Sequence, residues 1–399
     1  NQSIMSKPIS SLLLLLLVIA GCKKDAKTAV SDYPHTPQDD LLHLNEIQII
    51  ASHNSYRLHT TDTVFKYLYQ IQSLLPSNLN PDGLDYTHVD FDEQMSTYGI
   101  RGLEIDIYND PNGGDFANRK INDFVNLPIE SGVADLNAPG FKVLHIKDVD
   151  YNTHYFTFKK ALEAVRNWSD AHPHHLPLFI NVETKQDAPG DNSTLAGFGF
   201  QKAIPWSAGA ADKLDEEVKA VFGENTDKLI TPDKLRGNLA TLEDAAKQKK
   251  WPTLYDSRGK IILIMQGNAE SYYKAGHPSL QGRTMFVYSA PGTPEAAFVI
   301  LNNPTSQKST ITQRVQEGYI VRTRSDADTQ EARTGDYTDM NNAFSSGAQI
   351  TSTDYYKPDL RGGIDSGWTT FSVKFPEGSI ARKNPVNAAG IDVDVKIEK

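Results

Sequence analysis

The sequence predicts a (β/α)8 barrel of the TIM type, regular or distorted, with a small β appendage at its C-terminal end. Eight short apolar runs with the length of strands recur from residue 44 onward. These runs are continuous rather than alternating, as expected for parallel strands that are covered on both faces. Amphipathic stretches lie between several of them, and this alternation of strands and helices is typical of a parallel barrel.

The eight predicted strands are "IQIIAS" (47–52), "IRGLEIDIY" (100–108), "FKVLHI" (141–146), "LPLFINVE" (176–183), "KIILIM" (260–265), "AAFVIL" (296–301), "YIVRTR" (319–324) and "AQITST" (348–353). Residues 155–172 and 232–250 have apolar side chains at helical spacing and are predicted helices. Residues 44–367 are therefore expected to form one barrel domain, a length that this fold allows. Residues 368–399 contain alternating β-like patches and are the predicted appendage.

The first 43 residues indicate a targeting segment and a tether. Lys7 precedes the apolar run "LLLLLLVIAGC" at 12–22, which ends in small residues and in Cys22. A charged start, a short apolar core and small residues are typical of a secretion signal, and the run is too short for a bilayer span of about 20 residues. Residues 23–43 are polar and predict a flexible tether.

The ending "IAGC" of the apolar run is similar to the bacterial lipoprotein signal. This resemblance implies that residues 1–22 are a signal peptide and that Cys22 becomes the lipidated first residue of the mature chain. We therefore expect an exported bacterial lipoprotein, anchored through Cys22 to a membrane of the cell envelope.

Composition excludes some classes of partner and site. The net charge of −10 provides no basic excess to neutralise phosphates, so we expect no nucleic-acid partner. The chain has one cysteine, which excludes an intrachain disulfide and a cysteine-based zinc site.

Polar side chains that suit catalysis follow several predicted strands. In a (β/α)8 barrel, catalytic groups gather where the strands end at the C-terminal face. The residues at these places are His53 and Asn54, Glu104 and Asp106, His145, Glu183, Asp326 and Asp328, and Asp354. Their joint occurrence predicts one polar site in the mouth of the barrel.

Glu104 and Asp106 lie two residues apart in a predicted strand, so both carboxylates point to the same side. Like charges at this distance repel unless a positive group lies between them. Asn54, Glu104, Asp106 and Glu183 form an all-oxygen set, which hard divalent cations prefer. The pattern predicts a metal site, with calcium as the expected ion and magnesium as the alternative. The histidines then remain for proton transfer.

Each of these residues also has a structural interpretation. A single histidine after a strand is more often a turn residue than a catalyst. Glu104 and Asp106 can pair with arginine, for instance Arg101, and Glu183 can pair with Lys185. The crowding of two histidines and three carboxylates into one barrel mouth favours the catalytic interpretation. Elsewhere, His88 and Asp90 precede a helical segment and are expected to cap it.

Four motifs, "SHNSY" (52–56), "GIRGLEIDIY" (99–108), "VLHIKD" (143–148) and "LFINVETK" (178–185), occur in order along the chain. Together they resemble the catalytic X-region of phosphoinositide-specific phospholipase C, and more closely the bacterial calcium-dependent branch of that superfamily. The resemblance extends through 258–267, 318–329 and 347–356, and so covers about residues 45–356.

The resemblance implies roles for the residues that match its motifs. The two catalytic histidines match His53 and His145, and the calcium ligands match Asn54, Glu104, Asp106 and Glu183. A basic group near the substrate phosphate matches Arg322 or Arg324, and Lys147, two residues beyond His145, is a further candidate.

The implied reaction is cleavage of phosphatidylinositol-type lipids. The inositol 2-hydroxyl would attack phosphorus, diacylglycerol would leave, and the cyclic inositol phosphate would form and could be opened by water. One histidine would act as base and the other as acid, with Glu104 as an alternative base. The resemblance does not assign which histidine has which role.

Two other functions compete with this reading. Glycerophosphodiester phosphodiesterases are also barrels with two histidines and a metal-bound Glu-x-Asp, but their site begins with His-Arg-Gly, whereas this chain has "HNSY". A non-catalytic surface lipoprotein that binds inositol or glycan head groups is the second alternative. The presence of both histidines and all four ligand positions argues against it.

Overall fold

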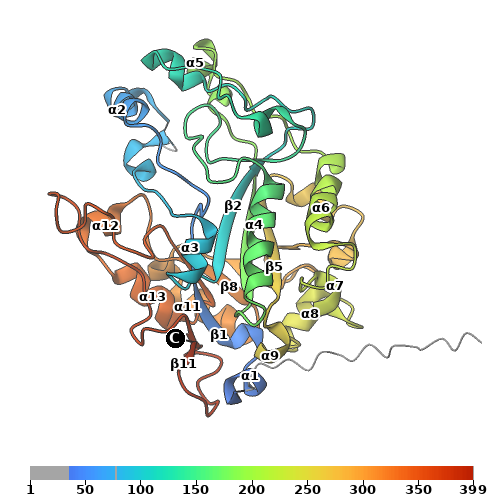
Figure 1. The fold of residues 1–399 in the computed structure, drawn as a ribbon. Helices are drawn as coiled ribbons and strands as arrows, with labels where there is room; N and C mark the ends of the chain where they lie inside the picture. The colour runs from blue at the N-terminus through green and yellow to red at the C-terminus, as the bar shows by residue number, and fades with distance from the viewer. Residues whose placement is uncertain (1–35, 77–78, 399) are drawn as a thin grey trace, which may run out of the picture. The chain divides into compact units, whose positions relative to one another are not determined.

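Eight parallel strands form a nearly closed barrel in the computed structural model, which describes residues 36–76 and 79–398 (Figure 1). Their order around the barrel is β6-β5-β4-β2-β1-β9-β8-β7. A single parallel bridge from Tyr288, directly after β6, to Phe298 in β7 connects the two ends of this order. The strands are β1 (Ile47–Ser52), β2 (Gly102–Tyr108), β4 (Leu178–Lys185), β5 (Ile261–Gly267), β6 (Phe286–Val287), β7 (Phe298–Ile300), β8 (Ile320–Arg324) and β9 (Ile350–Thr353). The predicted fold class is confirmed.

One predicted barrel strand is wrong, and one barrel strand was not predicted. The run at 141–146 yields only β3 (Lys142–Val143), which pairs antiparallel with the end of β2. A parallel partner would require the connection to cross back to the other end of the barrel, but residues 109–141 form only the short 3-10 helices η5 (Lys120–Val125) and η6 (Ala134–Asn137). The missing strand is β6, whose two residues are too few to show a periodic pattern.

Helices α1 to α13 surround the strands. They are α1 (Pro37–Leu41), α2 (Asp62–Gln70), α3 (Phe91–Ser96), α4 (Phe158–Ala171), α5 (Ser193–Gly197), α6 (Ala208–Phe222), α7 (Pro232–Arg236), α8 (Leu242–Lys247), α9 (Leu254–Ser257), α10 (Glu270–Lys274), α11 (Pro304–Glu317), α12 (Gln330–Thr334) and α13 (Thr338–Ser346). In the described part of the chain, none of the helices has the length and apolar content that a membrane span requires.

The two predicted helices differ in outcome. The one at 155–172 is confirmed as α4. The one at 232–250 divides into α7 and α8, because Gly237 at the end of α7 has a φ of 54° and turns the chain out of the helix.

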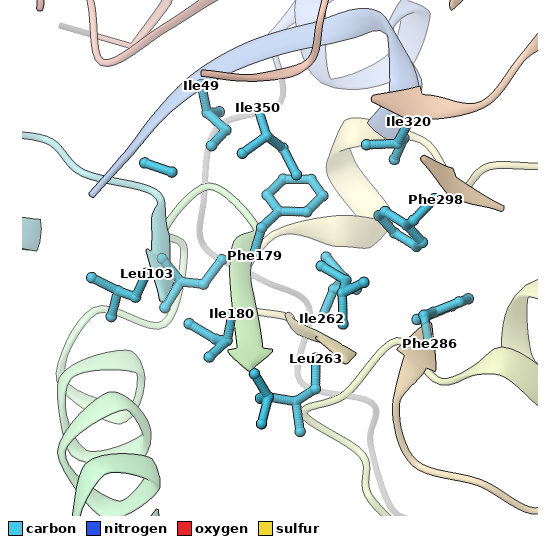
Figure 2. Packing of buried hydrophobic residues seen from close by; sticks show 14 of the residues in the cluster. Ile49, Leu103, Phe179, Ile180, Ile262, Leu263, Phe286, Phe298, Ile320 and Ile350 are labelled. Atoms are coloured by element: carbon cyan, nitrogen blue, oxygen red, sulfur yellow. The ribbon is translucent and has the colours of Figure 1, made fainter. Parts of the chain in front are cut away.

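The barrel interior changes from apolar to polar along the strands. Side chains two residues apart on β4 point the same way, and there the buried Phe179 precedes Asn181 and Glu183. Figure 2 shows Phe179 and Ile350 reaching toward one another from β4 and β9 within the apolar cluster. The apolar cluster fills the base of the barrel, and polar groups are therefore left to the end where the strands finish.

Gly102 lets β1 and β2 approach at their only ladder pair, Ala51 with Gly102. A Cβ at position 102 would lie 2.4 Å from the Cβ of Ala51, closer than two carbon atoms can pack. We expect Gly102→Ala to lower the Tm by several degrees in calorimetry, because the two strands must separate. Gly209→Ala, in open space on α6, is the matched control and should leave the Tm unchanged or slightly higher. Equal Tm values for the two variants would contradict this account.

The predicted C-terminal β appendage packs against the start of β1. Strand β10 (Ala381–Lys383) runs antiparallel to Ile47–Ile49, and β11 (Lys396–Glu398) runs antiparallel to β10. The carboxylate of Glu398 pairs with Arg101 at 3.3 Å and with Arg258 at 3.0 Å. Arg101 is thus engaged at the base of the barrel and does not pair with Glu104 or Asp106.

Cys22 and most of the predicted tether lie outside the described residues. The part that is described, residues 36–43, contains α1 and is docked on the barrel, with Asp39 fully buried. The Nε atom of Arg258 donates a hydrogen bond of 2.7 Å to Asp39 Oδ1.

Candidate active site

The acidic cluster of Glu104, Asp106 and Glu183 lies at the mouth-side end of β2 and β4. Strand register places Glu104 beside Asn181 and Asp106 beside Glu183. One carboxylate oxygen from each of the three residues lies within 4.8 Å of the others. The predicted metal-binding carboxylates are therefore brought together by the pairing of two adjacent strands.

Asp106 is fully buried, and neither of its carboxylate oxygens has a hydrogen-bond partner in the described part of the chain. The Lys185 ammonium is the nearest cation, at 3.5 Å from Asp106 Oδ2 and 3.7 Å from Glu183 Oε1. Burial, and then the charge of Glu183, raise the pKa of Asp106 above its ordinary value. Buried acceptors without a hydrogen-bond donor are rare in proteins, and the ion pair with Lys185 leaves both oxygens free to bind a metal ion as well.

Glu104 has a different environment, because donors occupy both of its oxygens. Arg322 donates to Oε2 at 2.6 Å, and Oε1 accepts from Asn181 at 2.8 Å and Gln266 at 3.3 Å. The positive groups beside the two carboxylates of β2 are thus Arg322 on one and Lys185 on the other. A contact between Arg322 and a substrate phosphate stays a prediction.

Asn54 lies on the turn after β1 with a φ of 45°, a left-handed conformation that asparagine tolerates better than most residues. Its amide nitrogen donates a hydrogen bond of 2.9 Å to the Tyr86 hydroxyl. The amide nitrogen is thereby engaged, and the carbonyl oxygen is left as the group that can bind a cation.

The donor set fits a calcium ion. The acidic cluster supplies three carboxylates, and calcium takes six to eight oxygen ligands in flexible geometry. The Asn54 amide oxygen stays the predicted fourth ligand. The unpartnered oxygens of buried Asp106 are the observation that supports a bound cation. Which residues bind the calcium ion stays a prediction.

His53 is held by the end of β9. Its Nδ1 atom lies 2.8 Å from Asp354 Oδ1, and its Nε2 atom lies 3.4 Å from Arg324. Arg324 also pairs with Asp354 at 3.0 Å. Burial, and then the charge of Arg324, lower the pKa of His53 well below its ordinary value. With Nδ1–H donating to Asp354, the unprotonated Nε2 is the atom that can accept a proton.

His88 also positions His53, in place of the capping role that the sequence suggested. Its Nε2 atom is 2.8 Å from the His53 carbonyl oxygen, to which it donates. Asp90 alone caps α3, by accepting from the Glu93 amide.

His145 lies in the loop after β3 and has its own carboxylate. Its Nδ1 atom is 2.7 Å from Asp150 Oδ2, and burial lowers the pKa of the histidine. Asp150 is also bound by the fully buried Arg57, at 2.6 Å from Nε and 3.1 Å from Nη2. Burial opposes the ionisation of Asp150, but Arg57 and His145 outweigh it and lower its pKa to about 2.

Arg57 connects the two histidines. It follows His53 on the same turn, where its amide donates to the Asn54 carbonyl at 2.9 Å, and its side chain holds the partner of His145. The guanidinium also donates to the backbone carbonyls of Leu84 and Tyr86. A fully buried arginine thus links the loop after β1 to the loop after β3.

The low pKa of Asp150 predicts how acid affects stability. A carboxylate whose pKa is lower in the folded than in the unfolded protein stabilises the fold above its unfolded pKa of about 3.9, and this stabilisation is lost as pH falls toward 2. We expect Asp150→Asn to cost about 2 to 3 kcal/mol at pH 6, and the cost to shrink toward pH 3. Urea unfolding at several pH values measures the difference. A cost that does not depend on pH would contradict the assignment.

A cavity of about 390 Å³ opens beside His145 and Lys185. Its lining also includes Tyr108, Asp187 and Asn192, and its volume is in the range of small-molecule sites. The cavity places a histidine and a lysine where a substrate head group can enter.

The predicted phosphate-binding residues separate into two places. Arg324 faces His53 in the mouth of the barrel. Lys147 is buried and its ammonium pairs with Asp115 at 2.5 Å and donates to the Lys202 carbonyl at 3.0 Å. Lys185, which the sequence suggested only as a partner of Glu183, is the lysine that lines the cavity.

Some residues that support the site were missed from the sequence. Asp354 was noted only as a strand-end residue, and its bond to His53 depends on β1 and β9 being neighbours. Asp150 follows His145 by five residues, a spacing that has no periodic signal. Nothing in the local sequence indicates Arg57 or Tyr86, because their partners come from distant loops.

Comparison with known protein families finds that residues 42–385 match the model of the family described as phosphoinositide phospholipase C, Ca2+-dependent. No curated protein matches the sequence significantly.

Among solved structures, the chain is similar to a calcium-dependent phosphoinositol-specific phospholipase C from Pseudomonas sp., at 18% identity over 84% of this chain and 98% of that chain, with a TM-score of 0.47. A Ca2+-dependent phosphatidylinositol-specific phospholipase C from Streptomyces antibioticus is 15% identical over 79% and 95% of the two chains, with a TM-score of 0.46. The corresponding values for the phosphatidylinositol-specific phospholipase C of Listeria monocytogenes are 12%, 78%, 89% and 0.42.

Proposed function

The chain belongs to the Ca2+-dependent phosphoinositide phospholipase C family. From this premise we propose that it cleaves phosphatidylinositol to diacylglycerol and a cyclic inositol phosphate. We propose that one of the two histidines, His53 and His145, is the base and the other is the acid. The observation that carries the proposal is the pair of histidines, each bonded through Nδ1 to a buried aspartate, beside one acidic cluster. An internal nucleophile needs a group that takes its proton and a group that protonates the leaving alkoxide.

The aspartates set the state of the two histidines. Asp354 and Asp150 each accept from an Nδ1–H group, so each Nε2 atom is the one that can exchange a proton with the substrate; Arg324 contacts that of His53 at 3.4 Å. Burial lowers both histidine pKa values, so an unprotonated Nε2 is available near neutral pH. One Nε2 then accepts the proton of the inositol 2-hydroxyl, while the other takes a proton from solvent and donates it to the diacylglycerol oxygen.

Asn54, Glu104, Asp106 and Glu183 would hold the calcium ion. When bound, the ion supplies positive charge that lowers the pKa of the attacking hydroxyl and neutralises charge on the phosphate. Arg322 orients Glu104 through its 2.6 Å hydrogen bond. We therefore assign Glu104 to metal binding and give the proton transfers to the histidines.

Arg324 and Lys185 are the cations that can contact the substrate phosphate. Arg324 lies 3.4 Å from the Nε2 atom of His53, and Lys185 lines the cavity beside His145. A guanidinium donates two parallel hydrogen bonds to phosphate oxygens. We propose that Arg324 orients the phosphate and that Lys185 turns from Asp106 toward it.

The test uses protein lacking residues 1–22, phosphatidylinositol micelles, and either calcium or a chelator, with the product identified by phosphorus NMR. We expect a cyclic inositol phosphate that appears only with calcium. Glycerol phosphate as the product would instead support a glycerophosphodiester phosphodiesterase. Binding of inositol without turnover would support a lipoprotein that only captures head groups.

We also propose that Cys22 carries a lipid that anchors the exported protein to a cell-envelope membrane. The support is the order of Lys7, the short apolar run and "IAGC" in the sequence. We expect Cys22→Ser to move the protein from the membrane fraction to the soluble fraction of the cells that express it. Membrane association that survives this substitution would contradict the anchor.

A further inference from the structure

The chain enters the barrel at the end opposite to the active site. Residues 42–44 dock on the segment before β5: the Leu42 carbonyl accepts from the Leu254 amide at 2.7 Å, and the Leu44 amide donates to the Pro252 carbonyl at 3.0 Å. Because β5 begins at Ile261, this docking site lies at the N-terminal ends of the strands. Figure 1 shows α1 and β11 at this end, with α2 and α5 at the other.

The tether is short compared with the protein that it would hold. Thirteen residues, 23–35, lie between Cys22 and the first described residue, and such a segment spans at most about 45 Å when fully extended. For a compact unit with as many residues as His35–Lys399, the expected radius of gyration is about 21 Å, which is that of a sphere of about 27 Å radius. A path over its surface from base to mouth is then about 80 Å, which exceeds the reach of the tether.

The mouth carries the most exposed apolar side chains of the described residues. Leu360 is 84% exposed, Ile364 80%, Leu74 76% and Phe198 57%. All four belong to segments that leave the C-terminal ends of strands: Leu360 and Ile364 follow β9, Leu74 follows β1 and Phe198 follows β4. These four side chains lie on loops at one end of the barrel, and the substrate of the family is itself a lipid, so this end is the one that we expect to meet a bilayer.

We propose that the Cys22 lipid and the active site serve two different bilayers, so that the anchored enzyme cleaves phosphoinositides in a membrane facing its own. This inference rests on the proposed lipid anchor and the proposed activity. Because the tether is too short to bring the mouth to the bilayer that holds Cys22, the mouth with Leu360 and Ile364 is left to act on an opposing one.

The single cysteine allows a direct test. Protein of residues 22–399 is coupled through Cys22 to a maleimide phospholipid in carrier vesicles that contain phosphatidylinositol deuterated in its inositol ring. Free vesicles with unlabelled phosphatidylinositol are added in tenfold excess. We expect the inositol phosphate, measured by mass spectrometry, to come from free vesicles in proportion to their share of the lipid. Without free vesicles, tenfold dilution of the carriers should lower the rate per enzyme about tenfold.

The matched control moves the same lipid to the mouth. In Cys22→Ser/Thr194→Cys the anchor is attached to the exposed residue 194 on α5, and we expect deuterated product at a rate that does not change on dilution. The same behaviour from the protein coupled at Cys22 would overturn the proposal. Turnover of detergent micelles by both proteins is measured first, so that failure of the proposed activity is distinguished from failure of the orientation.

The apolar rim is tested with a second pair of variants. Leu360→Ser/Ile364→Ser is expected to lower turnover of free vesicles about tenfold while turnover of a short-chain soluble phosphatidylinositol is unchanged. Leu41→Ser, at a residue 50% exposed on α1, is the control and should change neither rate. An equal loss with Leu41→Ser, or a vesicle rate unaffected by the rim variant, would show that the mouth does not contact the opposing bilayer.

Discussion

His53→Ala is expected to lower kcat for phosphatidylinositol by about three to four powers of ten, because general acid–base groups contribute up to about 10⁴-fold. His53 is bonded to Asp354 at 2.8 Å and lies at the end of β1 beside the acidic cluster, so its loss removes one of the two proton-transfer groups. KM should change little, since Arg324 and the acidic cluster remain. Initial rates at saturating calcium measure the effect.

Two controls make the His53 result specific. His277→Ala changes a histidine that precedes β6. Among the described residues, the His277 ring forms a hydrogen bond only with the Gln281 carbonyl, so this variant should keep the full rate. The Tm of His53→Ala should stay within a few degrees of the parent, since the His53 ring is partly exposed. A near-normal rate for His53→Ala would remove this residue from the mechanism.

Asp106→Asn is expected to abolish calcium-dependent turnover while raising the Tm of the calcium-free protein. The Asp106 carboxylate is buried, has no hydrogen-bond partner among the described residues, and lies beside Glu183. A neutral amide removes this repulsion and the cost of a buried charge. It also removes the ion pair of Asp106 with Lys185, but Lys185 keeps Glu183 as a partner at 3.7 Å. The same change removes a ligand with full negative charge, so calcium affinity should fall steeply.

Calorimetry with calcium and with chelator separates the two effects. In the parent protein, calcium at 100 times its Kd should add about 2.7 kcal/mol of stability, and this gain should vanish in Asp106→Asn. Asp123→Asn, at a carboxylate that is 51% exposed, is the matched control and should keep both the calcium gain and the activity. Calcium-stimulated turnover in Asp106→Asn would contradict the metal assignment.

The two predictions test residues of different kinds. Replacement of His53 removes proton transfer but should leave calcium binding intact, because its ring contacts Asp354 and Arg324 rather than the acidic cluster. Replacement of Asp106 should remove calcium binding with both histidines in place. Calcium titration by calorimetry on both variants therefore shows whether the metal and the histidines act as separate parts of the site.

Much of the barrel could be predicted from the sequence because its longer strands are continuous apolar runs. Strands β1, β2, β4, β5, β7, β8 and β9 all lie within or overlap the predicted ranges. Prediction was wrong at 141–146, where an apolar run pairs antiparallel with β2, and it missed the two-residue β6. An apolar run indicates burial, but strand direction and the identity of the neighbour depend on how the connecting segment travels.

The sequence by itself determined the fold class, the family and the column of acidic residues on β2, because these depend on local patterns and on spacing along one strand. Only the tertiary structure decided which charge faces which. Asp354 reaches His53 because β9 pairs with β1, and the Arg57 side chain reaches Asp150 across two loops. Such contacts join residues that are dozens to hundreds of positions apart, and the electrostatic environment of a buried group is set by neighbours in space rather than by neighbours in the chain.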